Sequence, residues 1–201
     1  MQKVVITGHT QGLGAALYNK FKSLNYQVVG LSRSNGYNIT DNFDAVVQAA
    51  SGADIFINNA YHDAQQTKLL HALKHRVDMM VVMGSITRLY PVLLDSEYTR
   101  HKKDLADACF IESIKPSSIP ILHLDLSFLK EATENTDPLA FKSDYNTPLN
   151  DIVETILFWT KMPTIRNIEF SWKLTDVVQS EIARLHPNIN LSDISKLINT
   201  V

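Results

Sequence analysis

Three residues that can exchange a proton are spaced along this chain as a catalytic site would need them. Tyr98 and Lys102 stand four positions apart, so on a helix they share one face, and Ser85 precedes Tyr98 by thirteen positions. A phenol ionises near pH ~10, and a neighbouring ammonium favours its ionised form. A serine hydroxyl beside the pair can hold a substrate oxygen. These residues predict proton exchange at a carbonyl or an alcohol, with Tyr98 as acid and base.

The Tyr-x-x-x-Lys spacing is weak evidence by itself, because it occurs a second time at Tyr18 and Lys22. We expect that second pair to face solvent, opposite the apolar side of its helix. Tyr98 and Lys102 instead lie on the apolar stripe of their own expected helix, and only they follow a serine at a strand end. An amphipathic surface helix without a catalytic role is the alternative.

A glycine-rich turn near the start of the chain can hold a nucleotide. The segment Thr7-Gly8-His9-Thr10-Gln11-Gly12-Leu13-Gly14 follows a short apolar run and opens a segment of helical period. The free N–H groups and positive dipole of a helix start attract a pyrophosphate, and glycines let the backbone approach it. A tight turn without a ligand is the alternative. The expected contacts here are Gly8, Thr10, Gln11, Gly12, Leu13 and Gly14.

The end of the second expected strand indicates which dinucleotide would bind. In a doubly wound α/β fold the end of the second strand meets the adenosine ribose. An acidic residue at that position would bind the 2′-hydroxyl of the ribose. Here Ser32 and Arg33 stand at the strand end, with no acidic residue. A guanidinium suits a 2′-phosphate, so NADP is favoured over NAD. A solvated arginine in a loop is the alternative.

Short apolar runs alternate with segments of helical period, which is typical of a parallel sheet wrapped by helices. We therefore predict an α/β fold: a Rossmann-like, doubly wound, mainly parallel sheet in three α/β/α layers. One domain is expected over residues 1–201, with 174–201 as a C-terminal helical extension. Helices are expected over Gly12 to Leu24, Ala64 to Arg76 and Ser96 to Lys115, and a loop over Glu131 to Asn150. The expected strands are Val4–Thr7, Val28–Ser32, Ile55–Asn58, Met79–Gly84, Ile119–Asp125 and Ile168–Trp172.

Composition excludes several classes of protein. A formal charge of −2 gives no electrostatic reason to expect nucleic acid or an anionic membrane as a partner. No apolar run approaches the ~20 residues of a membrane span. The single Cys109 fits a reducing compartment, so we expect a cytoplasmic protein. No metal site is expected.

Taken together, these motifs resemble those of the short-chain dehydrogenase/reductase family, from Met1 to about Trp172. The glycine turn is similar to the family's cofactor turn, and Ser85 with Tyr98 and Lys102 is similar to its catalytic residues. Asn58-Asn59-Ala60 is similar to its Asn-Asn-Ala-Gly motif. The resemblance implies a nicotinamide cofactor and Tyr98 as the catalytic acid and base. It also implies cofactor contacts from Asn38, Ile39, Asn59, Ala60, Tyr98 and Lys102.

The chain also departs from the family's pattern. Tyr61 replaces the glycine of the Asn-Asn-Ala-Gly motif, and the stretch from Arg33 to Asn38 is too short for the usual helix. The helix asparagine that completes a catalytic tetrad has no counterpart. Leu126-Ser127-Phe128 stands where the family carries Pro-Gly, and Ser127 could supply backbone contacts in its place.

The leading functional prediction is an NADP(H)-dependent oxidoreductase that acts on a small carbonyl or alcohol. The alternatives are a dinucleotide-binding sensor or scaffold with little catalysis, and an isomerase or epimerase that retains its nicotinamide. The substrate pocket is expected from the Leu89–Asp95 and Glu131–Asn150 loops. A homodimer or homotetramer is expected through the stripe of Ala106, Phe110 and Ile114, with internal packing of that stripe as the alternative.

Overall fold

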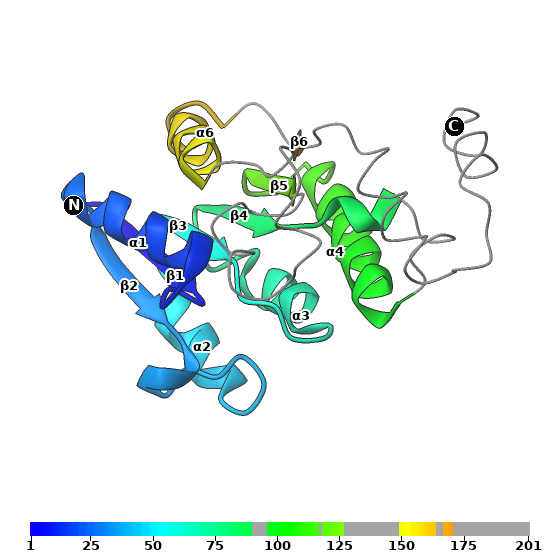
Figure 1. Cartoon of the computed structure of the whole chain (residues 1–201), viewed down its shortest axis with the longest axis horizontal. Helices are drawn as coiled ribbons and strands as arrows, with labels where there is room; N and C mark the ends of the chain where they lie inside the picture. The colour runs from blue at the N-terminus through cyan, green and yellow to red at the C-terminus, as the bar shows by residue number, and fades with distance from the viewer. Residues whose placement is uncertain (90–95, 117, 127–148, 164–166, 171–201) are drawn as a thin grey trace, which may run out of the picture.

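A sheet of six parallel strands forms the centre of the protein (Figure 1). The computed structural model describes residues 1–89, 96–116, 118–126, 149–163 and 167–170. The strand order is β2-β1-β3-β4-β5-β6, and every neighbouring pair is parallel. The strands are β1 (Lys3–Thr7), β2 (Gln27–Leu31), β3 (Ile55–Asn58), β4 (Met79–Met83), β5 (Ile121–Leu126) and β6 (Asn167–Phe170).

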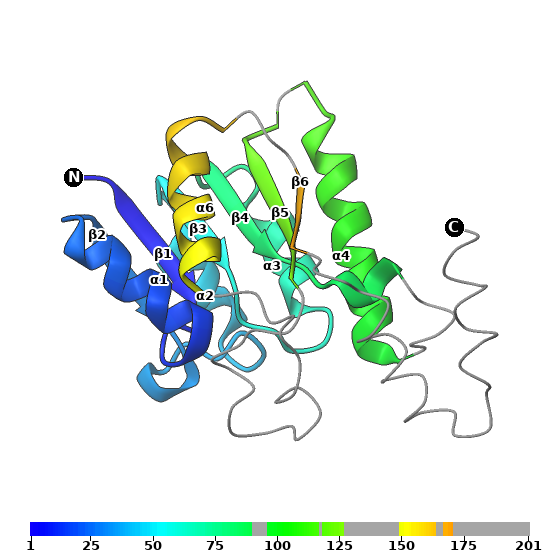
Figure 2. The same ribbon diagram turned by 45° about the horizontal axis from the view of Figure 1, so that its top comes forward.

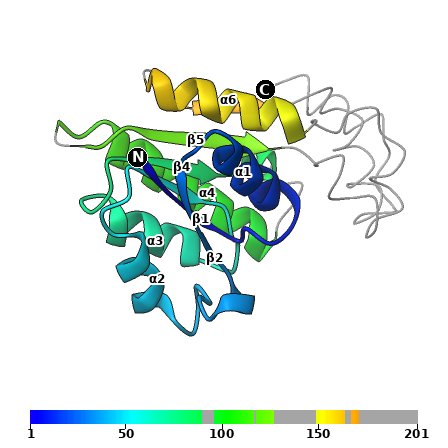
Figure 3. The same ribbon diagram turned by 90° about the vertical axis from the view of Figure 1, so that its left-hand side faces the viewer.

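The helices cover both faces of the sheet, so the protein has three layers. Figure 3 shows α1 (Gly12–Ser23) and α6 (Leu149–Lys161) on one side of the strands, with α2 (Phe43–Ala50) and α3 (Gln65–Leu73) on the other. The longest described helix, α4 (Glu97–Ser113), lies on the same face as α3 and packs against it. This arrangement is the doubly wound α/β fold that the sequence predicted.

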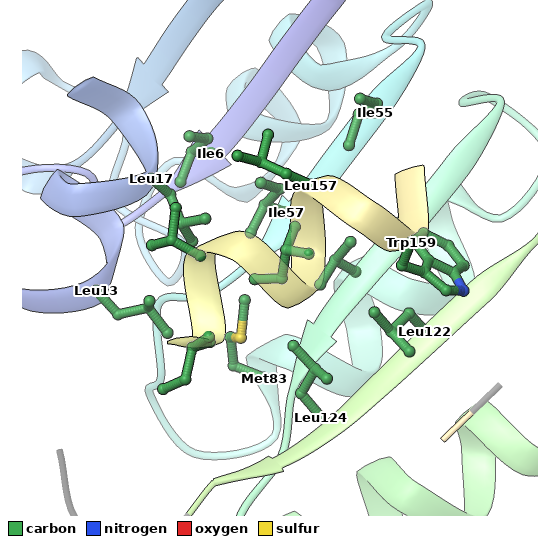
Figure 4. Close-up of a cluster of buried hydrophobic side chains, with 14 of the residues drawn as sticks. Ile6, Leu13, Leu17, Ile55, Ile57, Met83, Leu122, Leu124, Leu157 and Trp159 are labelled. Atoms are coloured by element: carbon green, nitrogen blue, oxygen red, sulfur yellow. The ribbon is translucent and has the colours of Figure 1, made fainter. Parts of the chain in front are cut away.

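The central strands β3, β4 and β5 are mostly apolar because both of their faces are buried, and two of their few polar residues, Asn58 and Asp125, lie at or near the carboxyl ends. On one face, Leu13 and Leu17 of α1 and Leu157 and Trp159 of α6 pack onto strand residues such as Leu122 (Figure 4). The other face holds a second cluster. Its helical members include Val46 and Val47 of α2, Leu69, Leu70 and Leu73 of α3, and Leu105 and Cys109 of α4.

All six strands run in the same direction, so their carboxyl ends meet at one edge of the sheet (Figure 2). The chain leaves β1 for β2 on one side and returns to β3 on the other. Open α/β sheets bind ligands at such a reversal, in a crevice beyond the carboxyl ends of the strands, so we expect the site beyond the ends of β1 and β3. The loops that follow β1, β3 and β4 carry the glycine turn, Asn59 and Ser85.

The expected elements agree with the structure to within a few residues. Each of the six expected strands is present, and a single helix, α3, lies between β3 and β4. Residues 33–35 form only the short 3-10 turn η1, which agrees with the expected lack of room for a helix there. Two helices had not been predicted, α2 and α6, and the expected loop from Glu131 is wrong at its end because Leu149 and Asn150 belong to α6. The expected helices over 174–201 lie outside the described residues.

In the part of the chain that the structure describes, no helix is both long and apolar enough to cross a bilayer. Nor do three or more His, Cys, Asp or Glu side chains gather there as a metal site would require. The cytoplasmic location stays a prediction.

One buried carboxylate joins α3 to α4 away from the glycine turn. Glu112 is 5% exposed, and its Oε1 accepts hydrogen bonds of 2.8 Å from both Lys74 Nζ and Lys115 Nζ. The bonds from Lys115 and Lys74 lower the pKa of Glu112 to about 2, against the opposing effect of burial. Because the folded-state pKa is below the unfolded value, this contribution to stability is complete above pH ~4.5 and is lost as the pH falls towards 2.

We expect Glu112→Gln to lower the free energy of unfolding by about 1 kcal/mol at pH 7, because both lysines lose their ionic partner. The difference from the wild type should shrink as the pH falls from 5 to 3. Urea denaturation at these pH values measures it. The control is Asp107→Asn, which removes only an exposed pair with Lys103 and should change stability by less than about 0.5 kcal/mol. A loss that is equal at pH 7 and pH 3 would show that Glu112 acts through packing alone.

Candidate active site

The glycine turn after β1 is held closely against the neighbouring strands. Gly8 has a φ of +71° and donates its N–H to the Leu31 carbonyl at 2.7 Å. Gly14 lies so near this turn that a Cβ at its position would sit 2.1 Å from the Gly8 carbonyl oxygen. Only glycine fits there, so these two residues serve the close approach of α1 to the turn.

The start of α1 is open to an anion. Gln11 is the N-cap residue, but its side chain makes no capping bond, and the first turn of α1 holds no acidic residue. The first N–H bonded within the helix is that of Ala15, to the Gln11 carbonyl at 3.2 Å. Among the described residues, no backbone acceptor takes the N–H groups of Gly12, Leu13 or Gly14. Unpaired donors at a positive helix end are what a phosphate group requires.

The residues after β3 brace this turn. Thr7 Oγ1 accepts the N–H groups of Asn59 and Ala60, each at 3.0 Å. The Asn59 side chain donates to the Thr7 carbonyl at 3.0 Å and to the Gly8 carbonyl at 3.3 Å. Asn59 and Ala60 therefore lie beside the glycine turn, as the sequence predicted, and the Asn59 amide holds the shape of the turn.

The end of β2 presents Arg33 to solvent. Ser32 is buried, and its hydroxyl shares a 2.8 Å hydrogen bond with that of Ser34. Asn35 closes the turn by accepting the Ser32 N–H at 2.8 Å. Arg33 is exposed, and its guanidinium makes no ion pair with any described residue. A cation is thus available next to the crevice.

Asn38 and Ile39 are less available than expected. The Asn38 side chain donates to Asp41 Oδ2 at 2.5 Å and accepts the Thr40 N–H at 3.1 Å. Ile39 is buried in the core cluster between the sheet and α2. A cofactor contact from either residue stays a prediction.

The second Tyr-x-x-x-Lys pair, Tyr18 and Lys22, lies on α1, away from Ser85. The prediction that both of its side chains face solvent is wrong for Tyr18. Tyr18 does not point into solvent: it is half-buried against the core cluster below α1, and its ring lies 5.1 Å from that of His9. Lys22 is exposed, with its Nζ 4.9 Å from the Tyr18 ring. The Tyr18 ring covers the edge of the core because a tyrosine combines an apolar ring with a polar hydroxyl.

The structure brings Ser85 and Tyr98 together at the carboxyl end of β4. Ser85 is buried, and its hydroxyl is held by the Thr87 N–H at 3.3 Å and the Thr87 hydroxyl at 3.0 Å. Tyr98 is 38% exposed as a residue, but the partial burial of its phenol raises its pKa, and a side-chain hydrogen bond with Ser85 partly opposes that effect. Tyr98 lies in the first turn of α4, which Ser96 caps by accepting the Thr99 N–H at 3.1 Å.

Lys102, one turn further along α4, is buried with its amine directed into the protein. Its Nζ donates to Gln66 Oε1 and to the Met83 carbonyl, both at 2.7 Å. The same Nζ lies 5.6 Å from the centre of the Tyr98 ring. Burial lowers the pKa of Lys102 to about 7, although the charge of Asp125 acts to raise it. Ser85, Tyr98 and Lys102 thus form one group, as the spacing predicted.

Tyr61, which stands where the family carries a glycine, reaches this group. Its ring packs edge-on against the Tyr98 ring, with 4.8 Å between the centres, and lies 5.2 Å from Lys102 Nζ. Its hydroxyl is 3.2 Å from His101 Nδ1. The Lys102 amine therefore has an aromatic ring from each of two tyrosines near it, an arrangement that favours a cation.

A buried ion pair positions the Ser85 turn. Asp125 of β5 is fully buried and accepts two bonds from Arg88 Nε, at 2.8 and 2.9 Å, and one from Arg88 Nη2 at 2.5 Å. Arg88 belongs to the 3-10 turn η2 (Ile86–Leu89), directly after Ser85. Gly84 has no room for a side chain, because a Cβ there would lie 2.3 Å from His123 Nε2.

Some residues of the site were not found from the sequence. Gln66, Asp125 and Arg88 lie far apart along the chain and belong to no spaced motif, so only the fold brings them to Lys102 and Ser85. Ser127 and most of the two loops expected to line the substrate pocket lie outside the described residues. Of the expected interface stripe, Ala106 is buried whereas Phe110 and Ile114 are 66% and 58% exposed.

No protein-family model and no curated protein matches this sequence. Solved structures are similar in three dimensions. A 3-ketoacyl-(acyl-carrier-protein) reductase from Brucella melitensis, complexed with NADH, has a TM-score of 0.68 at 15% identity, over 85% of this chain and 96% of its own. A short-chain dehydrogenase/reductase superfamily protein from Agrobacterium tumefaciens, with bound NAD, has a TM-score of 0.66 at 15% identity, over 92% and 83%.

A UDP-N-acetylglucosamine 4-epimerase from Bacillus cereus is similar to the same degree, with a TM-score of 0.66 at 15% identity over 94% of this chain and 87% of its own. At such identities the likeness shows the fold. This chain therefore has the Rossmann-like fold of the short-chain dehydrogenase/reductase proteins, as its motifs predicted.

Proposed function

We propose that the protein is an NADP(H)-dependent oxidoreductase acting on a small carbonyl or alcohol. One observation carries the proposal: the Lys102 amine lies 5.6 Å from the centre of the Tyr98 ring, at the sheet edge that also holds Ser85 and the glycine turn. A fold of this kind hosts many functions, so the argument rests on the site.

The residues of the crevice fit a dinucleotide. The free N–H groups at the start of α1 would hold the pyrophosphate, and Arg33 would pair with a 2′-phosphate. Asn59 and Ala60 shape the neighbouring wall. The reductase and the superfamily protein described above contain NADH and NAD, so the preference for NADP in this chain depends on Arg33 alone. When bound, the nicotinamide supplies or accepts the hydride.

The protein's own part is to handle the proton of the substrate oxygen. Ser85 would hold that oxygen by a hydrogen bond, and Tyr98 would donate its phenolic proton to it or take one from it. The raised pKa of Tyr98 opposes release of the proton, whereas a charged Lys102 favours it. Since the pKa of Lys102 is about 7, the amine changes charge in the range where the enzyme would work.

A second candidate is a dinucleotide-binding sensor or scaffold with little catalysis. It is favoured by the raised pKa of Tyr98 and by the Tyr61 ring packed against it. An isomerase that retains its nicotinamide is supported only by the likeness in fold to the epimerase. NADPH binding without oxidation across a broad panel of aldehydes and ketones would favour the sensor over the oxidoreductase.

We expect Tyr98→Phe to lower kcat/KM for the best substrate of such a panel by at least about 100-fold, because the proton donor is lost. Calorimetry should show NADPH binding within about threefold of the wild type. Tyr18→Phe, at the second Tyr-x-x-x-Lys copy, is the matched control and should keep full activity. Turnover within fivefold of the wild type in Tyr98→Phe would exclude this mechanism.

Arg33→Ser should weaken NADPH binding by about 10-fold or more and leave NADH binding unchanged, because only NADPH offers a phosphate to the guanidinium. Isothermal titration with both cofactors measures this. Arg76→Ser, which removes an exposed arginine from the loop between α3 and β4, is the control. Equal weakening of both cofactors would remove the argument for NADP.

We also propose that the protein self-associates through the α4 patch, formed by the exposed Phe110, Ile111 and Ile114. Light scattering after size exclusion should give a mass above 22.6 kDa for the wild type. The double variant Phe110→Ser, Ile114→Ser should shift that mass towards the monomer. Leu24→Ser, at an exposed leucine after α1, is the control, and a monomeric wild type would contradict the proposal.

A further inference from the structure

Gln66 is a buried side chain that forms several hydrogen bonds next to Ser85, Tyr98 and Lys102. It lies in the first turn of α3 and is 1% exposed. Its Nε2 donates to the Asn58 carbonyl at 2.9 Å and to the Met83 carbonyl at 3.2 Å, and its backbone carbonyl accepts from Asn58 Nδ2 at 2.8 Å. The side chain therefore ties α3 to the ends of both β3 and β4.

These contacts fix which end of the Gln66 amide faces Lys102. Two carbonyl oxygens surround one end, so that end must be the NH2 group. The oxygen then faces the Lys102 amine at 2.7 Å. An ammonium can only donate, and two of its three N–H groups are taken by Gln66 Oε1 and the Met83 carbonyl. Among the described residues the third N–H has no acceptor oxygen, and the amine lies near the Tyr61 and Tyr98 rings.

We infer that Gln66 is a positioning residue, which fixes the direction of the Lys102 amine and keeps it as a cation beside Tyr98. This inference rests on the proposed function, because it assigns Gln66 a task in that site. Gln66 does so through Lys102, because its side-chain hydrogen bonds are to Lys102, Asn58 and Met83. The family's helix asparagine, which completes the catalytic tetrad, has no counterpart in this sequence. Gln66 instead contacts the lysine amine directly.

The charge of Lys102 depends on a small set of surrounding groups. From β5 the carboxylate of Asp125 favours the cation, while Cys109 lies on the same helix with a pKa that burial raises. The rings of Tyr61 and Tyr98 face the amine from the loop after β3 and from α4. Against the cost of burial, the two acceptor oxygens stabilise the charged form. Removing one of them must lower the pKa of Lys102 further.

The test compares Gln66→Met and Gln66→Glu with the wild type. Methionine keeps the length and volume of the side chain but offers no acceptor, so the pKa of Lys102 should fall by about one unit or more. Glutamate places a carboxylate beside the amine, so the pKa should rise by a similar amount. Nuclear magnetic resonance of lysine labelled with 13C at Cε, with Lys102→Met for assignment, reads these values without any turnover. Gln65→Met, on the neighbouring and partly exposed residue, is the control.

Kinetics supplies the second readout. In Gln66→Met, kcat at pH 7.5 should fall about tenfold while KM for NADPH stays within threefold, and activity should recover as the pH is lowered. In Gln66→Glu the basic limb of the kcat profile should move to higher pH. A purely structural role would lower activity equally at every pH. That result, or a pKa of Lys102 that is the same in all three proteins, would overturn the inference.

The two readouts separate this inference from the proposed function. Shifted pKa values in a protein that turns over no substrate would support the role of Gln66 and reject the oxidoreductase. If circular dichroism shows that Gln66→Met does not fold, Gln66→Glu carries the test, because it keeps the length of the side chain and an oxygen towards Lys102. An unshifted pKa in that variant would then be decisive against the inference.

Discussion

The candidate site depends on how a buried amine is held. Lys102 is 3% exposed, and its two bonds to Gln66 and the Met83 carbonyl, the charge of Asp125 and two aromatic rings offset the cost of burying the amine. These contacts come from α3, β4, β5, the loop after β3 and α4 itself. The packing of the sheet thus fixes the amine beside Tyr98, and the chemistry of the site follows from that placement.

The sequence predicted the fold well because its strands are buried on both faces. Continuous runs such as Val4–Thr7 and Ile55–Asn58 leave little choice other than central parallel strands. The grouping of Ser85, Tyr98 and Lys102 was also predictable, since Tyr98 and Lys102 are one helical turn apart and Ser85 follows a strand. The helical spacing of two residues and the position of the third at a strand end were sufficient to predict that these three residues lie together.

The rest required the folded chain. The Gln66–Lys102 bond and the Arg88–Asp125 pair join residues 36 and 37 positions apart in sequence, and no local period marks them. Tyr18 was misplaced because helical periodicity alone assigned it to the solvent side, although its ring packs at the edge of the core. Helix α6 was missed because its apolar residues follow a polar stretch that was assigned to a loop up to Asn150.

The Arg88–Asp125 pair also limits how substrates could enter. Moving the turn that carries Ser85 away from the sheet would separate the guanidinium from a carboxylate with no exposure to water, at a cost of roughly 3–5 kcal/mol. That wall of the crevice is therefore rigid, and η2 cannot serve as a hinge. In the proposed reaction, Ser85 would therefore keep its place throughout, and any movement that admits a substrate would belong to other segments of the chain.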